Sequence, residues 1–362
     1  MRVLRITPSY ASSSNPGSGL NAYFHSKHSK FGSFILTENR GLEYLDTRLD
    51  IDLRAIRTFQ SNLGEINGKY FVLRLFRKFI STLIFTLKSL FYIHSIKPNI
   101  VHIYSPIYLV TALHCKIFYK SKVVMTLHGT DGQRIRKYSS LKVIFVMVDV
   151  CLSMSKEVST YFPEGRVRFL GNGYDKTIFR LRPDNIEVRR KYIVTVGNLR
   201  WQKNHINLID AFQVFNSTNT NYKLLIVGEG ELRNRLEKRI VQLGLEGNVI
   251  LLGKKNQNYI ARLMNVADFF VLSSVSEGFP KAVSEAMACG LPVLTTNVGD
   301  MKSTISSPLG LVVDSTVESL ANGLNEMVLN GPFDRATIAD SVGSKSWESV
   351  TKNLDKIYEG SV

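Results

Sequence analysis

The sequence predicts an α/β protein made of two doubly wound, Rossmann-like domains. Its 362 residues are enough for two domains that each bury a core. Short apolar runs alternate along the chain with longer helical stretches, which is the pattern of βαβ units and parallel sheets. A polar stretch containing glycine and proline, from residue 171 to 190, divides the chain near its middle. We therefore expect one domain over 1–171 and a second over 172–342.

The apolar runs give the expected strands of each half. The clearest are Val3–Ile6, Ile100–Tyr104, Val123–Leu127 and Val150–Ser153, followed by Ile193–Val196, Leu224–Val227, Val249–Leu252, Phe269–Leu272 and Val293–Thr295. Helices are expected between them, for instance over Ile206–Phe215 and Glu231–Leu243. Doubly wound sheets bind ligands at the carboxyl ends of their strands. We expect the site in the cleft between the two domains.

Composition limits the cellular setting. Hydrophobic residues make up 44% of the chain and charged residues 21%, which is ordinary for a soluble protein. Cys115, Cys151 and Cys289 lie scattered in apolar stretches, which favours a reducing cytoplasm over a disulfide framework or zinc site. No apolar run reaches the ~18 residues of a membrane span. Met1–Ile6 resembles a first strand more than a signal peptide.

The net charge of +16 points to an anionic partner: nucleic acid, a membrane surface or phosphorylated substrates. No nucleic-acid-binding motif is apparent in the sequence. Within the apolar stretch Tyr70–Ile96, at ~100° per helical residue, four basic residues share one arc. They are Arg74, Arg77, Lys78 and Lys88. Two interpretations stay open, namely a sheet-covering helix with a charged solvent face and an interfacial helix on anionic lipid.

The most informative segment is Ser276–Val293. Gly278 and Pro280 break the chain between an apolar strand and an alanine-rich helix, and proline suits a first helical turn. The free amides and positive dipole end of such a helix can hold an anion. Glu277 and Glu285 bracket that position, with Glu285 roughly 7 Å along the axis at ~1.5 Å per residue. The arrangement suits a sugar nucleotide.

This pair of carboxylates has two other interpretations. They could be solvated glutamates at the ends of a helix, or the paired acids of a glycoside hydrolase. The hydrolase interpretation gives no reason for a phosphate-ready helix terminus between them.

The spacing Glu277-x7-Glu285 resembles the signature of the retaining glycosyltransferases of family 4, which have the GT-B fold of two Rossmann-like domains facing a central cleft. The likeness is strongest from about residue 172 to 300. Further matching blocks are Asn172–Asp175 with Phe179, Val227–Gly230, Asn248–Gly253, Ala267-Asp268, and Ser346–Glu348 with Tyr358. The resemblance implies an acceptor-side first domain, a donor-binding second domain, and a helix over 343–362 that packs back on the first domain.

The resemblance also implies roles on the donor side. Glu277 and the residues after it contact the donor sugar, and Glu285 holds the ribose hydroxyls; these following residues are Gly278, Phe279, Pro280 and Lys281. Lys203 falls on the lysine that pairs with the donor diphosphate, a suitable use of a compact cation. Asn198 stands where the family usually has arginine, and Arg200 is a candidate replacement.

Five more positions are carried over from the same resemblance. His128, in Thr126–Asp131, resembles the family's acceptor-side histidine, with a histidine satisfied by loop hydrogen bonds as the alternative. Gly17 and Gly19 stand for its glycine-rich loop. Glu229 borders the base pocket, although its glycines alone explain a sharp turn, and Lys254 lies where the base is usually contacted.

We thus expect a metal-independent, retaining hexosyltransferase without a cofactor, using a UDP- or GDP-linked sugar. The expected acceptor is a lipid-linked glycan in bacterial O-antigen, capsule or exopolysaccharide biosynthesis. The enzyme would be cytoplasmic and peripheral at the inner face of the cytoplasmic membrane, with an anionic membrane surface and no nucleic acid as partners. Two alternatives are another GT-B enzyme, a phosphorylase or sugar-nucleotide epimerase, and a non-enzymatic polyanion-binding protein.

Overall fold

The computed structural model describes residues 1–8, 20–38, 52–56, 71–127, 144–182, 191–277 and 280–360. The chain divides into two compact units, and each is described by itself. Unit 1 comprises Met1–Gly171 together with Trp347–Val362, and unit 2 comprises Asn172–Ser346. Five of the predicted site residues lie outside the described residues, namely Gly17, Gly19, His128, Gly278 and Phe279.

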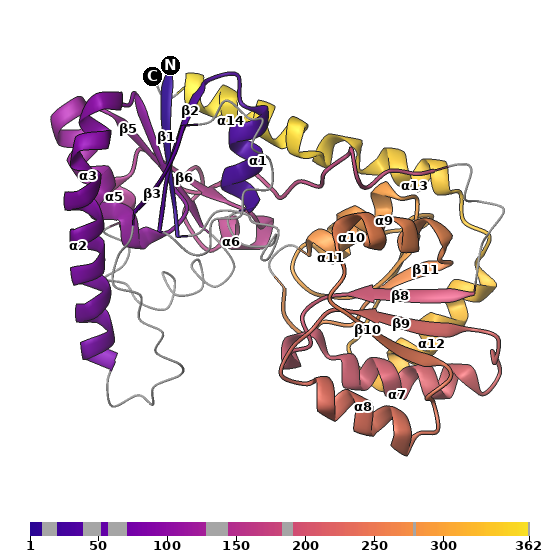
Figure 1. Cartoon of the computed structure of the whole chain (residues 1–362). Helices are drawn as coiled ribbons and strands as arrows, with labels where there is room; N and C mark the ends of the chain where they lie inside the picture. Colours follow the sequence, from indigo (N-terminus) through magenta and orange to yellow (C-terminus); the bar gives the residue numbers. More distant parts are fainter. Residues whose placement is uncertain are drawn as a thin grey trace. The chain divides into compact units, whose positions relative to one another are not determined.

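Unit 1 contains a parallel sheet that the described residues form from seven strands in the order β3-β2-β1-β4-β5-β6-β7 (Figure 1). The strands are β1 (Arg2–Thr7), β2 (Gly32–Glu38), β3 (Asp52–Ile56), β4 (Ile100–Ile103), β5 (Lys122–Leu127), β6 (Val150–Ser153) and β7 (Arg168–Phe169). The helices are α1 (Leu20–His28), α2 (Phe71–Ile96), α3 (Leu109–Tyr119), α5 (Ile144–Met147), α6 (Lys156–Thr160) and α14 (Trp347–Glu359). Among the described residues, no helix has the length and apolarity needed to cross a bilayer.

Successive residues of the unit 1 strands face opposite sides of the sheet, so the sheet has two apolar layers. On one side, Leu4 and Val101 pack against α2 and α3 through residues such as Phe85 and Ala112. On the other side, Val3 and Ile100 pack against α1 and α14. The stacked rings of Phe24 and Trp347, with centroids 5.1 Å apart, join α1 to α14.

Polar side chains lie within the α1/α14 layer. Arg5 of β1 stands opposite His102 of β4 in the strand register. His102 contacts the Tyr358 hydroxyl through Nδ1 and the Thr126 hydroxyl through Nε2, each at 2.7 Å. The Arg5 guanidinium donates to Ser33 Oγ at 2.8 Å and lies 5.7 Å from the centre of the Tyr358 ring. These buried polar groups bind α14 to the middle of the sheet.

Unit 2 repeats the plan with a parallel sheet in the order β10-β9-β8-β11-β12-β13. Its strands are β8 (Tyr192–Val196), β9 (Lys223–Val227), β10 (Val249–Gly253), β11 (Phe269–Leu272), β12 (Val293–Thr296) and β13 (Gly310–Val313). Its helices are α7 (His205–Asn216), α8 (Arg233–Gln242), α9 (Gln257–Val266), α10 (Lys281–Ala288), α11 (Met301–Thr304), α12 (Val317–Leu329) and α13 (Arg335–Ser341). The predicted fold class, two Rossmann-like parallel-sheet domains, is confirmed.

Glycine allows two loops of unit 2 to touch. Gly228, after β9, has φ +148°, and a Cβ there would lie 1.9 Å from the carbonyl oxygen of Gly197. The amide of Leu199 also donates to the carbonyl of Glu229 at 2.9 Å. The loops after β8 and β9 therefore lie in direct backbone contact, which only glycine permits at this position.

Arg335, the first residue of α13, is a buried cation in unit 2. Its guanidinium donates to the carbonyl oxygens of Gly290, Asn265, Met264 and Ala267 at 2.7 to 3.1 Å. These carbonyls lie at the carboxyl ends of α9 and α10, where the helix dipoles favour a positive charge. Arg335 thereby fastens α13 to both helices.

Candidate functional site

The strand order of unit 2 fixes where its candidate site lies. From β8 the chain continues to β9 and β10 on one side, whereas β11, β12 and β13 lie on the other. Adjacent strands β8 and β11 therefore form the switch point at which ligands bind in doubly wound sheets. Lys203 ends the 3-10 turn Trp201–Lys203 after β8, and Glu277 follows the end of β11.

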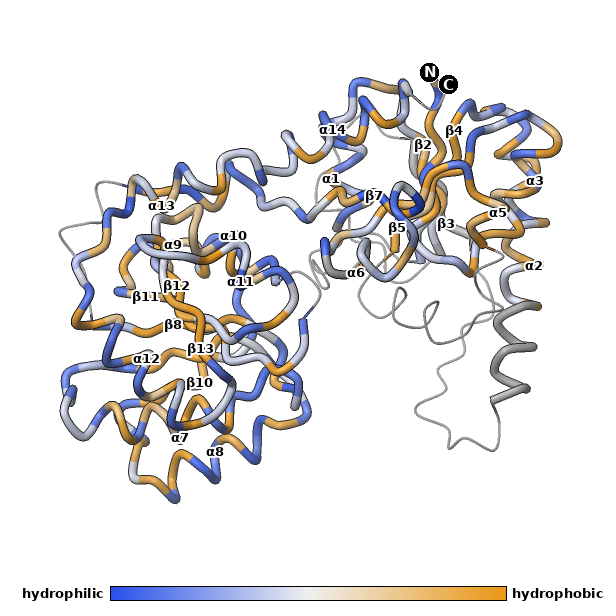
Figure 2. Tube along the Cα trace, turned by 180° about the vertical axis from the view of Figure 1, so that it is seen from behind, coloured by the Kyte–Doolittle hydropathy of each residue, from blue (hydrophilic) through white to orange (hydrophobic). Residues whose placement is uncertain are grey.

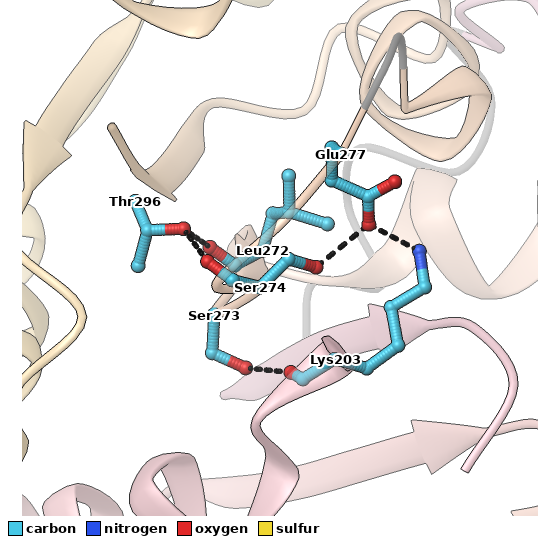
Figure 3. Close-up of polar contacts among 6 residues, drawn as sticks. All are labelled: Lys203, Leu272, Ser273, Ser274, Glu277 and Thr296. Carbon is cyan, nitrogen blue, oxygen red and sulfur yellow. Dashed lines mark hydrogen bonds and ion pairs between the residues drawn. The ribbon is translucent and has the colours of Figure 1, made fainter. Parts of the chain in front are cut away.

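The structure brings these two predicted residues together. Lys203 Nζ lies 2.5 Å from Glu277 Oε1, and the Ser274 hydroxyl donates to the same oxygen at 2.7 Å (Figure 3). The side chains of Lys203 and Glu277 are 24% and 13% exposed, so a ligand can reach a largely desolvated ion pair. Both contacts fall on Oε1, and Oε2 projects away from them in Figure 3.

Three buried hydroxyls hold the two loops in place, and sequence reasoning missed all three. Ser273 Oγ donates to the Lys203 carbonyl at 2.8 Å, which ties the β8 loop to the end of β11. Thr296 Oγ1, at the end of β12, lies 2.5 Å from the Ser274 carbonyl. The three side chains are at most 1% exposed. The available signal was a pair of serines placed directly after the apolar run of β11.

Helix α10 begins one residue later than expected. Pro280, predicted to lie in its first turn, is the extended N-cap residue, and Lys281 is the first helical residue. Lys281 and Glu285 are four residues apart, so they lie on one helix face, and both are half-buried.

Burial shifts the proton equilibria of this pair. It raises the pKa of Glu285 to about 7, although the neighbouring Lys281 cation opposes the shift. It lowers the pKa of Lys281 to about 8, against the attraction of the Glu285 carboxylate. Both groups therefore titrate close to neutral pH.

The remaining donor-side candidates of unit 2 lie on neighbouring loops. Asn198 and Arg200 are exposed on the loop after β8, and the Arg200 amide donates to the Asn198 carbonyl at 2.8 Å. Glu229 is paired with Arg233 at 2.7 Å. A Cβ at Gly253 would lie 2.9 Å from Glu229 Oε1, so Glu229 lies beside the start of the loop that carries the exposed Lys254.

Metal ligands do not gather in the described part of the chain, where no three histidine, cysteine or acidic side chains are placed to share an ion. The cysteines Cys115, Cys151 and Cys289 are buried thiols, and burial raises the pKa of each to about 12. The described part of the site therefore offers hydroxyl, carboxylate and ammonium groups for its chemistry.

Known proteins resemble this chain both in sequence and in fold. Residues 177–341, within unit 2, match the family model of glycosyl transferases group 1. The solved structure of Anabaena HepE in complex with UDP and glucose superposes with a TM-score of 0.75 at 18% identity, covering 99% of each chain. The sucrose-phosphate synthase of Thermosynechococcus elongatus superposes with a TM-score of 0.78, also at 18% identity, over 99% of this chain and 98% of the other. The fold is that of the GT-B glycosyltransferases.

Curated sequences agree with the structural comparison. A Campylobacter jejuni enzyme is 36% identical over 42% of this chain and 41% of its own length; it is the N-acetylgalactosamine-N,N'-diacetylbacillosaminyl-diphospho-undecaprenol 4-alpha-N-acetylgalactosaminyltransferase. The Escherichia coli UDP-Gal:alpha-D-GlcNAc-diphosphoundecaprenol alpha-1,3-galactosyltransferase is 25% identical over 58% of this chain and 61% of its own length. The chain spans 65%, 41% and 68% of the lengths of three curated glycosyltransferases that it matches. Together these comparisons show that the chain has the GT-B fold and is similar in sequence to bacterial glycosyltransferases.

Proposed function

We propose that the protein is a retaining glycosyltransferase that moves a sugar from a nucleoside diphosphate to a hydroxyl of a glycan. The observation that carries the proposal is the Lys203–Glu277 pair at the β8/β11 switch point, followed by α10. This arrangement offers a cation for a diphosphate, helix-terminal amides beside it, and a carboxylate for sugar hydroxyls. No metal or cofactor is included in the proposal.

The proposed reaction breaks the bond between the anomeric carbon and the diphosphate oxygen. An acceptor hydroxyl oxygen then bonds to the same face of that carbon, and its proton passes to the departing diphosphate. Lys203 stabilises the negative charge that develops on the leaving group, a major source of catalysis in such transfers. Glu277 orients the sugar through a hydroxyl, while Glu285 binds the ribose hydroxyls.

The donor and acceptor classes follow from the relatives and from charge. UDP is the proposed nucleotide, with GDP as the alternative, because HepE was solved with UDP and the E. coli relative is named for UDP-Gal. Both bacterial relatives are named for acceptors linked to diphospho-undecaprenol. A lipid-linked glycan acceptor in bacterial surface polysaccharide synthesis, used at the cytoplasmic face of an anionic membrane, suits a chain of net charge +16.

A donor screen tests this function directly. Purified protein would be incubated with a panel of UDP- and GDP-linked sugars, with and without undecaprenyl-diphosphate-linked glycans, while nucleoside diphosphate release is measured. We expect release to depend on one donor and to rise when an acceptor is added. The anomeric configuration of the product, read from its NMR coupling constant, tests retention.

The same screen separates the alternatives. A sugar-nucleotide epimerase would convert or hydrolyse the donor without any glycan, and a phosphorylase would require inorganic phosphate. A polyanion-binding protein would bind no nucleoside diphosphate in calorimetry, and that result would overturn the proposal.

A further inference from the structure

Helix α2 has two apolar faces. The face that packs on the unit 1 sheet is formed by residues including Phe85, Ile93 and Ile96. At ~100° per residue, Leu87 and Phe91 point in the opposite direction, and they are 58% and 87% exposed. The sheet-covering interpretation of this helix is therefore correct for one face, and a second apolar stripe is left in solvent.

Helix α3 carries a matching stripe beside it. The two helices are joined by the hydroxyl contact of Thr86 with Thr111 at 2.7 Å and lie side by side in both views (Figures 1 and 2). Ile117 and Phe118, on the outer side of α3, are 72% and 67% exposed. We call Leu87, Phe91, Ile117 and Phe118 the outer apolar face. Large apolar side chains gathered on a surface mark a contact with a partner or a membrane.

The positive charge around α2 and α3 indicates which kind of partner the outer apolar face contacts. Residues 71–127 contain eight lysines and arginines and neither aspartate nor glutamate, so they hold half of the net charge of +16. Three lysines of this region are exposed: Lys88 on α2, Lys120 directly after α3, and Lys122 at the start of β5. Two copies of such a face would repel each other, and its four apolar side chains offer nucleic acid no hydrogen bonds. An anionic lipid surface satisfies both features, with apolar side chains below the headgroups and lysines among them.

We propose that α2 and α3 dock unit 1 on an anionic lipid bilayer, with Phe91, Ile117 and Phe118 inserted at the interface. This inference rests on the proposed function for its purpose, because a lipid-linked acceptor must be met at the bilayer, and it assigns the membrane contact to particular side chains. Lys88, Lys120 and Lys122 contribute attraction, whereas the outer apolar face contributes insertion. The other members of the predicted basic stripe, Arg74, Arg77 and Lys78, have side chains outside the described part of the structure. Docking should therefore respond both to lipid charge and to the loss of apolar side chains.

Vesicle sedimentation of the full chain tests the docking face. Phosphatidylglycerol vesicles are compared with phosphatidylcholine vesicles, using the wild type and a triple variant, Phe91→Ser, Ile117→Ser and Phe118→Ser. The matched control carries three equivalent changes at exposed apolar positions of unit 2, Val214→Ser, Val241→Ser and Leu329→Ser. We expect the triple variant to bind phosphatidylglycerol vesicles at least tenfold more weakly than the wild type, and the control to bind equally well. Phosphatidylcholine should bind the wild type weakly.

The outcomes separate this inference from the proposed function. An unchanged circular dichroism spectrum and an unchanged urea unfolding transition of unit 1 would show that the triple variant is folded. Equal vesicle binding by variant and wild type, or no binding by the wild type, would overturn the docking face. A concentration-dependent dimer in lipid-free sedimentation that the triple variant abolishes would make it an interface between copies instead. Vesicle binding without any glycosyl transfer would retain the docking face and refute the proposed function.

Discussion

The two units share the same order over six strands, to which unit 1 adds β7, and they place very different groups at the centre of their sheets. In unit 2 the central strands β8 and β11 contain neither charged residues nor histidine, and the polar pair Lys203–Glu277 lies beyond their carboxyl ends. In unit 1 the central strands β1 and β4 carry Arg5 and His102 within the strands themselves. The position of a polar residue along the strand thus decides its surroundings.

Polar side chains at these two positions therefore have different neighbours and different access to solvent. A side chain in the middle of a strand meets the helix that covers the sheet, so His102 binds Tyr358 of α14 and has no path to solvent. A side chain beyond the end of a strand lies at the rim, where Glu277 is held by protein on one oxygen and remains reachable. The polar centre of unit 1 holds α14 on the sheet, whereas we expect the polar rim of unit 2 to bind a ligand.

The largest effect should come from Lys203→Ala. Removing the cation beside a departing diphosphate should lower kcat/KM on the order of 100- to 1,000-fold. Steady-state transfer assays measure the loss, and Lys223→Ala, an exposed lysine at the start of β9, is the control. Equal activity of the two variants would show that Lys203 does not take part in the reaction.

Donor binding should depend on pH through α10. Because the pKa of Glu285 is raised to about 7, its carboxyl is protonated below that pH and accepts ribose hydrogen bonds poorly. Because the pKa of Lys281 is lowered to about 8, its charge is lost above that pH. Affinity for a nucleotide sugar should therefore be greatest between these values and fall on the order of tenfold per pH unit on the acid side.

Calorimetry with an intact nucleotide sugar measures this profile, since its diphosphate is a diester that does not titrate in the range. Glu285→Gln should flatten the acid limb and weaken binding by about 1–3 kcal/mol. An acid limb that persists in this variant would assign the titration to another group.

Ser274→Ala should separate turnover from binding. Without the hydroxyl that fixes Oε1 of Glu277, the carboxylate loses orientation, so kcat should fall about tenfold while donor affinity stays near wild type. Ser121→Ala is the matched control, because Ser121 is equally buried and donates one bond to Pro98 in unit 1. A parallel loss of kcat in both variants would indicate a general effect on stability.

The smallest effect concerns the polar centre of unit 1. Tyr358→Phe removes the hydroxyl that contacts His102 and should destabilise unit 1 by about 1 kcal/mol. Urea unfolding measures it, and Tyr119→Phe, which loses a solvent-exposed contact of 3.2 Å with His94, should change stability little. A loss of donor binding in Tyr358→Phe would contradict the view that the polar groups at the centre of the unit 1 sheet serve only stability.

Much of the fold could be predicted because buried parallel strands are short apolar runs. Phe269–Leu272 and Val150–Ser153 match β11 and β6 in full. Strand β13 was missed because it begins at a glycine, which leaves an apolar run of only three residues. Strand β2 was missed because its apolar run, Phe34–Leu36, is equally short and has polar residues or glycine on both sides.

The candidate site could be predicted only in part. Lys203 and Glu277 were selected by their motifs, and the pairing of β8 with β11 explains why residues far apart in sequence meet. Ser273, Ser274 and Thr296 were missed because their roles depend on which loop each hydroxyl meets across the sheet. The outer apolar face was missed because a single helix pattern cannot show that α3 places a second stripe beside α2.

The return of the chain to unit 1 affects how the protein is made. Trp347, Leu354 and Tyr358 complete an apolar layer whose other members include Val3 and Ile100. During synthesis the ribosome must finish all of unit 2 before it delivers these residues. We therefore expect unit 2 to fold first on the ribosome, and the earlier-made unit 1 to remain open on its α14 side until translation ends. A stop codon before residue 347 should spare the donor-binding unit and leave the other unit prone to aggregation.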